Sequence, residues 1–492
     1  MGHTSNKDAI KGLQPGPLWR YFLDISEIPR ESGHEDAIRD YIASQARETG
    51  LESRKDAAGN LLVIVPGSTG SLNRKPLALQ SHMDMVCEKE PGYDHDFKKD
   101  PLKLVREDRW IKAFKTTLGA DNGIGLAAML TIMSSREIKH PPLELLFTVD
   151  EETGLTGASS LEEGFVRART LINLDSEEEG SIYIGCAGGC NTEISLKLTK
   201  TKPPVGHVPV TVRLDGLKGG HSGIDIHEGR GNAIKLLARF LFNIMETIDL
   251  FLGDIKGGTK HNAIPRQASI TIYIKPQELA RLKEAIKQFN QVLLEELKDR
   301  DEHAQITIED AKASGQEVFS REDTKTTCLM LYALPNGVIR MSKDLENTTE
   351  TSTNCAVCKV DRARGVLKVL TSQRSILPTA IKDISDQVRS IGLMAGADAR
   401  RDNEYPAWRP NMESEILNIS RKVYNELFSR DPEVKVIHAG LECAVLAERY
   451  PGMDMVSFGP TIENAHSPSE RVDIDSVARF YRYLVSILEH LV

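Results

Sequence analysis

The pattern of apolar and polar positions divides the chain into three stretches, and the first alternates strand-like runs with helical ones. Strands that alternate with helices predict an α/β sheet with parallel strands. The strand-like runs lie within 60–67, 76–80, 142–158 and 170–185, and the helical patterns lie within 17–49 and 116–135.

The pattern changes near residue 190 and returns near residue 400. In between, stretches of alternating apolar residues at 207–217 and 268–276 flank the helical stretches 232–248 and 278–300, which favours an α+β domain with antiparallel strands. The sequence therefore predicts one α/β domain made of residues 1–186 and 399–492, interrupted by an inserted α+β domain at 187–398.

A histidine and an acid follow the run at 76–80. His82 and Asp84 are two residues apart, so an extended chain would point both side chains the same way. Open α/β sheets bind ligands beyond the carboxyl ends of their strands. The pair predicts a metal ligand with its orienting carboxylate, or alternatively a histidine that a neighbouring carboxylate simply satisfies.

Other acids and one more histidine also occur at strand exits or in the loops just after them. A set of His, Asp and Glu without thiols is typical of a hydrolytic metal centre. The full set is His82, Asp84, Asp121, Glu151, Glu152, Asp175 and His466.

Two divalent metals need one bridging carboxylate and about two further ligands each. Five residues fit that count, namely His82, Asp121, Glu152, Asp175 and His466. Asp84 is then available to orient His82, and Glu151 to act as a base. Alternatively, Glu151 and Glu152 belong to an acidic loop exposed to solvent. For the acids at 177–179, exposure to solvent is the prediction.

Composition narrows the class of protein. Of the 492 residues, 40% are hydrophobic and 27% are charged, as in ordinary globular proteins, and the net charge of −9 argues against nucleic acid or an anionic membrane as the main partner. The chain has no apolar run of membrane-spanning length and no signal-peptide pattern, so we expect a cytoplasmic location. Seven cysteines make a disulfide framework improbable, and Cys355 and Cys358 are interpreted as reduced thiols.

Several short motifs resemble those of the dinuclear zinc exopeptidases, a family that includes carboxypeptidase G, carnosinase and peptidase T. The longer stretches TTLGADNGIG, GLKGGHSG, HNAIPR and HAGLEC are similar to one branch, the cytosolic aminoacyl-histidine dipeptidases. The resemblance runs from about residue 15 to the C-terminus. The short motifs are HMDM at 82–85, GADNG at 119–123, DEETG at 150–154, LDSEEEG at 174–180 and AHSP at 465–468.

The resemblance implies a zinc-peptidase α/β catalytic domain, with a mixed sheet flanked by helices, that is interrupted by an inserted α+β lid domain. It implies two Zn²⁺ ions, for which Mn²⁺ or Co²⁺ could substitute, bridged by Asp121. His82 and Asp175 would hold one ion, and Glu152 and His466 the other. Glu151 would be the general base and later the proton donor, and Asp84 would orient His82.

The inserted domain has candidates of its own. By resemblance, His221 in GGHSG would polarise the scissile carbonyl, while Asn262 and Arg374 would hold the substrate's carboxylate or carbonyl oxygen. His438 and Gly440 in HAGLEC would shape the substrate pocket. The alternatives are that His221 caps a turn, that Asn262 satisfies backbone groups, and that Arg374 pairs with a surface acid.

The expected activity is hydrolysis of dipeptides, including Xaa-His dipeptides such as β-alanyl-histidine, by a water bridged between two zinc ions with a glutamate as general base. The expected partners are the dipeptide substrate and a second copy of the chain, which would form a homodimer through the lid. Three alternatives stay open: an aminoacylase or carboxypeptidase acting on N-acyl amino acids, a peptide-binding protein without catalysis, and an iron or manganese enzyme of the same fold.

Overall fold

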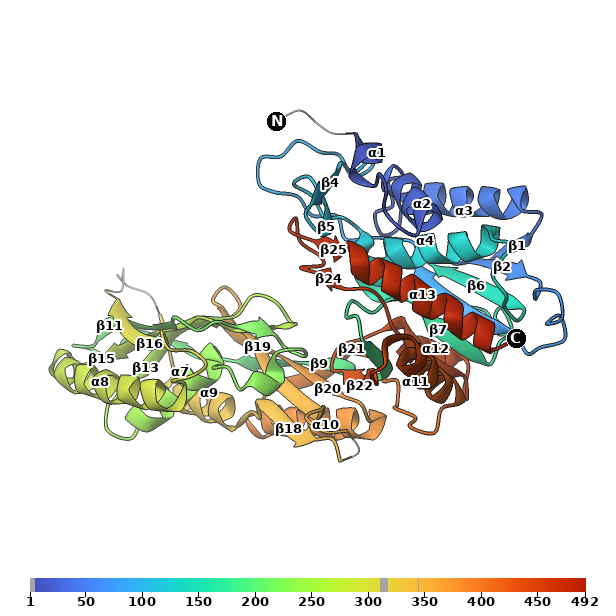
Figure 1. Ribbon diagram of the computed structural model, residues 1–492. Helices are drawn as coiled ribbons and strands as arrows, with labels where there is room; N and C mark the ends of the chain where they lie inside the picture. The colour runs from blue at the N-terminus through green and yellow to red at the C-terminus, as the bar shows by residue number, and fades with distance from the viewer. Residues whose placement is uncertain (1–4, 310–316, 344) are drawn as a thin grey trace. The chain divides into compact units, whose positions relative to one another are not determined.

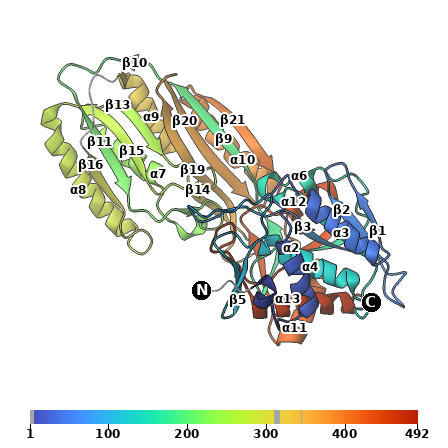
Figure 2. The same cartoon turned by 90° about the horizontal axis from the view of Figure 1, so that it is seen from above.

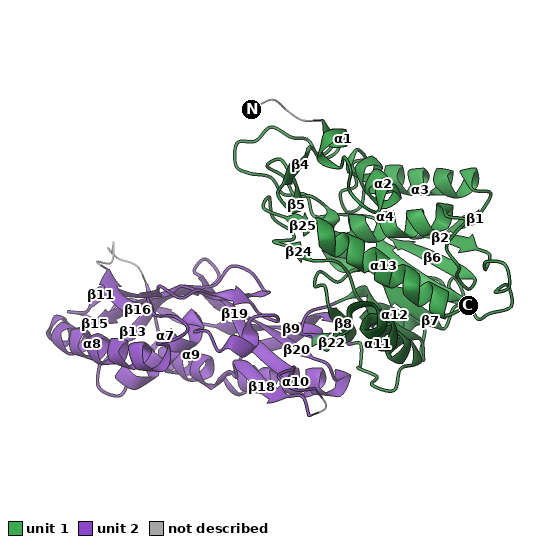
Figure 3. Ribbon diagram, in the orientation of Figure 1, with its two compact units in different colours: residues 1–185, 408–436, 441–492 green, residues 186–407, 437–440 purple. Residues whose placement is uncertain are grey.

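The computed structural model describes residues 5–309, 317–343 and 345–492. The chain divides into two compact units (Figure 3). The first comprises residues 1–185, 408–436 and 441–492, and the second comprises residues 186–407 and 437–440. The sequence pattern placed its boundaries after residues 186 and 398 and did not separate the short segment 437–440, which contains His438 and Gly440.

The first unit is built on an eight-stranded sheet with the order β1-β2-β6-β3-β7-β23-β8-β22. The pairs β6–β3, β3–β7 and β7–β23 are parallel, whereas β1–β2, β2–β6 and β23–β8 are antiparallel. The mixed sheet expected for this domain is therefore confirmed: its centre is parallel, as the alternation of strands and helices predicts, and its edges are antiparallel. The short turn between β1 and β2 permits only an antiparallel pair. The strands are β1 (Glu52–Lys55), β2 (Leu61–Val65), β3 (Leu77–His82), β6 (Leu143–Thr148), β7 (Thr170–Asn173), β8 (Ser181–Cys186), β22 (Glu433–Ile437) and β23 (Asp454–Ser457).

Helices cover both faces of this sheet. Leu77 and Leu79 of β3 belong to the main apolar core with α2, α3, α4 and α13, whereas Gln80 faces the other way and bonds to α12. Helix α4 is buried along almost its whole length, with α2 and α3 on its outer side (Figures 1 and 2). The helices are α1 (Asn6–Ala9), α2 (Gly16–Ser26), α3 (Asp36–Glu48), α4 (Ala120–Ser134), α5 (Glu151–Gly154), α6 (Thr156–Ser159), α11 (Glu415–Phe428), α12 (Glu442–Arg449) and α13 (Ile474–His490).

A smaller four-stranded sheet in the same unit has the order β24-β25-β5-β4. The loop between β24 (Ile462–Glu463) and β25 (Arg471–Asp473) carries His466, and the other two strands are β4 (Leu104–Glu107) and β5 (Trp110–Ala113). The hairpin formed by β24 and β25 therefore fixes both ends of the loop that holds His466.

The second unit is built on a nine-stranded sheet, and all its pairings among the described residues are antiparallel, as expected for the α+β stretch. In the described part of this unit, four long helices lie on one face of that sheet (Figure 1). The strands are β9 (Gly188–Lys197), β11 (Val208–Asp215), β13 (Phe251–Gly257), β15 (Ala268–Ile274), β16 (Gln305–Glu309), β18 (Gly337–Met341), β19 (Thr349–Asp361), β20 (Val366–Ser375) and β21 (Asp398–Tyr405).

The remaining elements of the second unit are helices and short strand pairs. The helices are α7 (Ala233–Ile244), α8 (Leu279–Glu296), α9 (Arg321–Ala333) and α10 (Pro378–Met394), with 3₁₀ turns η1 (Ile226–Glu228) and η2 (Pro276–Glu278). The short pairs are β10 (Lys200–Thr201) with β17 (Val318–Phe319), and β12 (Gly220–His221) with β14 (Ala263–Ile264).

Two features bear on the function classes considered. Across the described ranges, no helix combines the length and the apolar character needed to cross a membrane. Cys355 and Cys358 are buried as thiols on β19.

Candidate metal centre

The carboxyl ends of three neighbouring parallel strands bring most of the candidate residues of the first unit together. His82 is the last residue of β3, Glu151 and Glu152 open α5 three positions after the end of β6, and Asp175 comes two positions after the end of β7. Since β6, β3 and β7 are adjacent and parallel, these ends lie at one edge of the sheet. Asp121 comes from the first turn of α4, and His466 from the loop between β24 and β25.

Asp121 lies at the centre of these side chains. Its Oδ1 is 2.9 Å from Nε2 of His82, and its Oδ2 is 3.1 Å from Nε2 of His466. The same nitrogen of His82 is 3.1 Å from Oδ1 of Asp175, and that of His466 is 3.0 Å from Oε2 of Glu152. We call these five residues the Asp121 cluster; each oxygen of Asp121 lies close to Nε2 of one histidine, and each of these two nitrogens lies close to one further carboxylate.

Burial and charge together determine protonation in the Asp121 cluster. Burial alone would lower the pKa of His82, but Asp175 and Asp121 outweigh it and raise that pKa well above its ordinary value. Hydrogen bonds to Asp121 and Glu152 raise the pKa of His466 to about 11. Burial raises the pKa of Asp175 to about 7, because its charged form loses contact with water. The cluster is rich in acids, so its protein atoms attract positive charge.

The Asp121 cluster fits a pair of divalent cations. Nε2 of His82 and Nε2 of His466 each lie close to two carboxylate oxygens. His82, Asp121 and Asp175 offer three ligand atoms within 4.8 Å of one another. Oε1 of Glu152 is buried and has no hydrogen-bond partner among the described residues. Nitrogen and oxygen donors without sulfur suit zinc, manganese or cobalt, and a shared carboxylate suits two ions side by side.

Asp84 connects the end of β3 to the start of α5. Its Oδ1 lies 3.3 Å from Nδ1 of His82, on the opposite side of the ring from Asp121. Its two oxygens also accept hydrogen bonds from the backbone N–H groups of Glu151 and Glu152, each at 3.1 Å, and Ser32 donates a further one at 2.7 Å. Burial opposes ionisation of Asp84, but His82 and these donors lower its pKa to about 2. The carboxylate thus lies beside the His82 ring and holds the backbone of the two glutamates at the start of α5.

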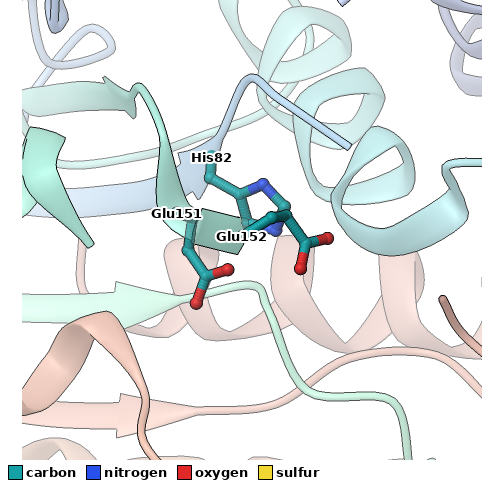
Figure 4. Close-up of side chains that lie close together, drawn as sticks. All are labelled: His82, Glu151 and Glu152. Atoms are coloured by element: carbon teal, nitrogen blue, oxygen red, sulfur yellow. The ribbon is translucent and has the colours of Figure 1, made fainter. Parts of the chain in front are cut away.

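Glu151 and Glu152 are adjacent, yet their carboxylates point in different directions beside the His82 ring (Figure 4). Glu152 contacts His466, whereas Glu151 makes no ion pair among the described residues. Burial raises the pKa of Glu151 well above its ordinary value, and neighbouring acids add to the effect of burial. The sequence-based alternative of a freely solvated loop is therefore wrong for this pair.

The second unit holds His221 in a defined tautomer. Its Nδ1 accepts hydrogen bonds from the backbone N–H groups of Gly223 at 3.2 Å and Ile224 at 3.0 Å. The backbone N–H of His221 donates to Oδ2 of Asp225 at 2.7 Å. Because Nδ1 is an acceptor, the ring proton of the neutral form is on Nε2. Burial, aided by the charge of Arg374, lowers the pKa of His221 to about 4.

Asn262 and Arg374 lie near this loop. The backbone oxygen of Asn262 accepts a hydrogen bond from Ser222 at 2.8 Å, next to the short ladder between β12 and β14. Arg374 is 6% exposed and donates to the hydroxyl of Tyr405 at 2.6 Å. Within the described ranges no carboxylate lies within 4 Å of Arg374, so the predicted alternative of a surface acid as its partner is wrong.

His438 and Gly440 lie in the segment 437–440. His438 is 8% exposed, and its Nε2 lies 2.8 Å from the hydroxyl of Ser352. A Cβ added at Gly223 would lie within 3.2 Å of Arg374 and would overlap the backbone oxygen of His438. The close approach that glycine permits therefore brings the GGHSG loop, Arg374 and His438 together, while Gly440 packs near Tyr405.

The sequence pattern did not indicate that Glu442 is buried near the site. Glu442 of α12 is fully buried and accepts hydrogen bonds from Gln80 at 2.6 Å and Thr148 at 2.8 Å. Burial raises its pKa to about 8. The motif HAGLEC contained this residue, but only the packing of α12 on the sheet reveals that it is buried against the ends of β3 and β6.

The prediction of solvation is correct for Glu177 and Glu178, which are exposed, and wrong for Glu179, which is half-buried. Glu177 remains exposed, yet its carboxylate lies within 4.8 Å of ligand atoms of Asp121 and His466. Glu178 pairs with Lys435 at 2.6 Å, and Glu179 accepts a hydrogen bond from Arg479 at 2.7 Å. Lys435 and Arg479 are about 250 to 300 residues away in the chain from Glu178 and Glu179. The local sequence pattern therefore could not indicate these pairs.

Comparisons with known proteins agree with this architecture. A family model for Peptidase family M20/M25/M40 matches residues 78–490. The cytosol non-specific dipeptidase of Escherichia coli (strain K12) is 40% identical over 482 residues, which cover 98% of this chain and 99% of that protein. The crystal structure of aminoacylhistidine dipeptidase from Vibrio alginolyticus matches with a TM-score of 0.89 at 41% identity, over 99% of this chain and 98% of that one.

A more distant structure has the same fold. Aminopeptidase PepT from Bacillus cereus matches with a TM-score of 0.56 at 16% identity, over 97% of this chain and 99% of that one. The matches at 40% and 41% identity extend over nearly the full length of the chain, so they include both units.

Proposed function

Because the chain belongs to peptidase family M20/M25/M40, we propose that it is a metal-dependent dipeptidase whose centre is the Asp121 cluster. One observation carries the proposal: the two oxygens of Asp121 face two separate sets of ligand atoms, one with His82 and Asp175 and the other with His466 and Glu152. Asp121 would bridge two ions, and each set would complete one site. Zinc is the metal proposed, and elemental analysis of the purified protein by plasma mass spectrometry tests it.

Two bound divalent cations would polarise a water molecule and the scissile carbonyl and stabilise the developing negative charge. Glu151 would accept the proton of that water and transfer it to the departing nitrogen, since it lies beside His82 and makes no ion pair among the described residues. Asp84 would hold His82 in orientation and, through the two backbone N–H groups of α5, would also keep Glu151 in place.

Residues of the second unit would bind the substrate. The neutral ring of His221 can donate a hydrogen bond from Nε2 to the substrate's carbonyl oxygen, because its other nitrogen is already an acceptor. Arg374 is a buried cation without an acidic partner among the described residues, which suits the C-terminal carboxylate of a peptide. Asn262 would hold the same end of the substrate, and His438 and Gly440 would line the pocket.

Dipeptides, including those with C-terminal histidine, are the proposed substrates, because the two relatives with about 40% identity are named as dipeptidases. The test is hydrolysis of β-alanyl-histidine, Gly-His, Leu-Gly, an N-acetyl amino acid and a tripeptide, each with and without chelator. We expect chelator-sensitive cleavage of the dipeptides alone. Cleavage of only the acetylated compound would make the protein an aminoacylase instead. The cytosol, named for the Escherichia coli relative, is the proposed location.

Substitution of Arg374 by methionine should weaken recognition of the substrate carboxylate. A buried charge pair that loses one partner typically costs 2–5 kcal/mol, so we expect kcat/KM for Gly-His to fall by about 30- to 3000-fold. The decrease should be much smaller for Gly-His amide, which lacks the carboxylate. Steady-state kinetics on both compounds measure the difference.

Arg400 provides the matched control, because its side chain is 79% exposed and pairs with Asp398 on the same sheet. Arg400→Met should leave both rates unchanged. If Arg374→Met lowered kcat/KM equally for Gly-His and for Gly-His amide, Arg374 would not bind the carboxylate.

We expect His221 to stay neutral, with its proton on Nε2, from pH 8 down to about pH 5, because its pKa is lowered to about 4. Between pH 4 and 6.5 the unfolded chain binds this proton more readily than the folded chain does. This group therefore makes the free energy of unfolding rise with pH in that window. Two-dimensional NMR of ¹⁵N-histidine-labelled protein measures the tautomer, with His221→Gln identifying the signal. A midpoint near pH 6.5, or a proton on Nδ1, would contradict the expectation.

A homodimer through the second unit is also proposed. Within the described ranges strand β18 pairs only with β19, and it exposes Ile339 (42%) and Met341 (44%) at the edge of the sheet. Exposed apolar edge strands are common sites of association. We expect sedimentation at twice 54.5 kDa and a shift to monomer in Met341→Lys. Leu294→Lys, on the exposed side of α8, is the control, and a wild-type monomer would refute the dimer.

A further inference from the structure

Two buried charged residues of the first unit, Arg30 and Glu470, are not part of the Asp121 cluster but contact the segment that leads into it. Each is 2% exposed. Both contact the loop and first turn that carry Asp121, at residues 118–121. Arg30 does so through the carbonyl oxygen of Gly119, and Glu470 through backbone N–H groups. Burying charges so completely costs free energy unless each finds partners, so their contacts indicate what they stabilise.

Glu470 binds four consecutive backbone N–H groups at the start of α4. Its Oε2 accepts from Leu118 at 2.7 Å and Gly119 at 3.0 Å, and its Oε1 accepts from Ala120 at 2.8 Å and Asp121 at 3.5 Å. Both oxygens are engaged, which fixes the carboxylate relative to the helix end, where a negative charge is also favourable. Since Glu470 follows His466 by four residues, it connects the segment of one proposed ligand to the backbone of another.

Arg30 connects the same loop to the end of β3. It donates to the backbone oxygens of Met83 at 3.1 Å and Asp84 at 2.6 Å, and through its other terminal nitrogen to that of Gly119. A Cβ at Gly119 would overlap the guanidinium, and the residue also has a positive φ of 65°. The loop therefore needs glycine at this position to approach Arg30.

We propose that Arg30 and Glu470 are positioning residues that set how far Asp121 lies from His82 and from His466, and hence the affinity for metal. Through them, three segments that carry proposed ligands share one buried frame: the end of β3, the start of α4 and the loop after β24. Glutamine cannot replace Glu470 without loss, because its NH₂ group would face N–H donors instead of accepting from them. The inference rests on the proposed metal centre.

The experiment compares Glu470→Gln with Glu144→Gln. Glu144 is the matched control: it is 5% exposed on β6 and accepts hydrogen bonds from the backbone of Arg167 at 2.7 Å and Ala168 at 2.9 Å, away from every proposed ligand segment. Both substitutions remove a buried carboxylate that binds backbone donors, so both should lower the stability of the metal-free protein to urea. Only Glu470→Gln should weaken binding of Zn²⁺, by about 10- to 100-fold.

Zinc affinity and stoichiometry are measured by calorimetric titration of the metal-free protein in competition with a chelator. Wild-type zinc affinity in Glu470→Gln, despite its lower stability, would overturn the inference and leave the proposed centre intact. If the wild-type protein binds no zinc, the proposed function and the inference both fall. Should Glu470→Gln not fold, Glu470→Asp replaces it, because aspartate keeps the charge but cannot reach all four donors; unchanged zinc affinity in that variant would equally overturn the inference.

Discussion

Replacement of Glu151 by alanine is expected to lower kcat for dipeptide hydrolysis by about 10²- to 10⁴-fold while zinc content stays at the wild-type value. None of the contacts within the Asp121 cluster involves Glu151, so the ligands keep their geometry without it. The water would then lose its base, and the leaving nitrogen would lose its proton donor. Steady-state kinetics and metal analysis on the same preparation measure both quantities.

Glu163→Ala is the control for this variant, because Glu163 is an exposed acid twelve residues further along the same segment. It should keep full activity. Glu151→Gln, which preserves the volume of the side chain, should be as slow as Glu151→Ala if proton transfer is the role. Full activity in Glu151→Ala would remove the residue from the mechanism, and loss of zinc would make it a ligand instead.

Replacement of Asp121 by alanine is expected to abolish activity and to weaken binding of both zinc ions by more than about 100-fold. Removing a residue that hydrogen-bonds to a metal ligand typically lowers the affinity for the metal by about 10- to 100-fold. The loss should be larger for Asp121, which would bind both ions directly. Zinc should raise the melting temperature of the wild-type protein, since a ligand that binds only the folded state stabilises it. That increase should be absent in Asp121→Ala, as measured by thermal unfolding with and without Zn²⁺.

The positions of the other ligands make this test specific. Asp175→Ala should reduce the stoichiometry by one ion, as should Glu152→Ala, because each contacts only one of the two histidines. Asp40→Ala, at an exposed position of α3, should change nothing. Two zinc ions bound at wild-type affinity in Asp121→Ala would refute the bridging role.

The features that depend on residues near one another in the chain could be predicted from the sequence alone. The apolar runs before His82, Glu151 and Asp175 predict strands, and residues that follow the carboxyl ends of adjacent parallel strands lie at the same edge of a sheet. The apolar pattern also distinguished the α/β domain from the inserted α+β domain. Half-buried antiparallel strands alternate apolar and polar residues, whereas fully buried parallel strands are apolar throughout. Short motifs then supplied the family resemblance.

Contacts between residues that are distant in the chain, and the burial of charged side chains, could be seen only in the folded protein. Asp121 and His466 are 345 positions apart, and Gln80 and Glu442 are 362 apart. Glu442 and Glu470 look like ordinary surface acids in the sequence, yet both are almost fully buried. Burial and hydrogen-bond partners depend on how helices and loops pack on the sheet. The sequence near a residue gives the chemistry of its side chain but not the residues that surround it in the folded protein. Those surrounding residues place Asp121 between His82 and His466.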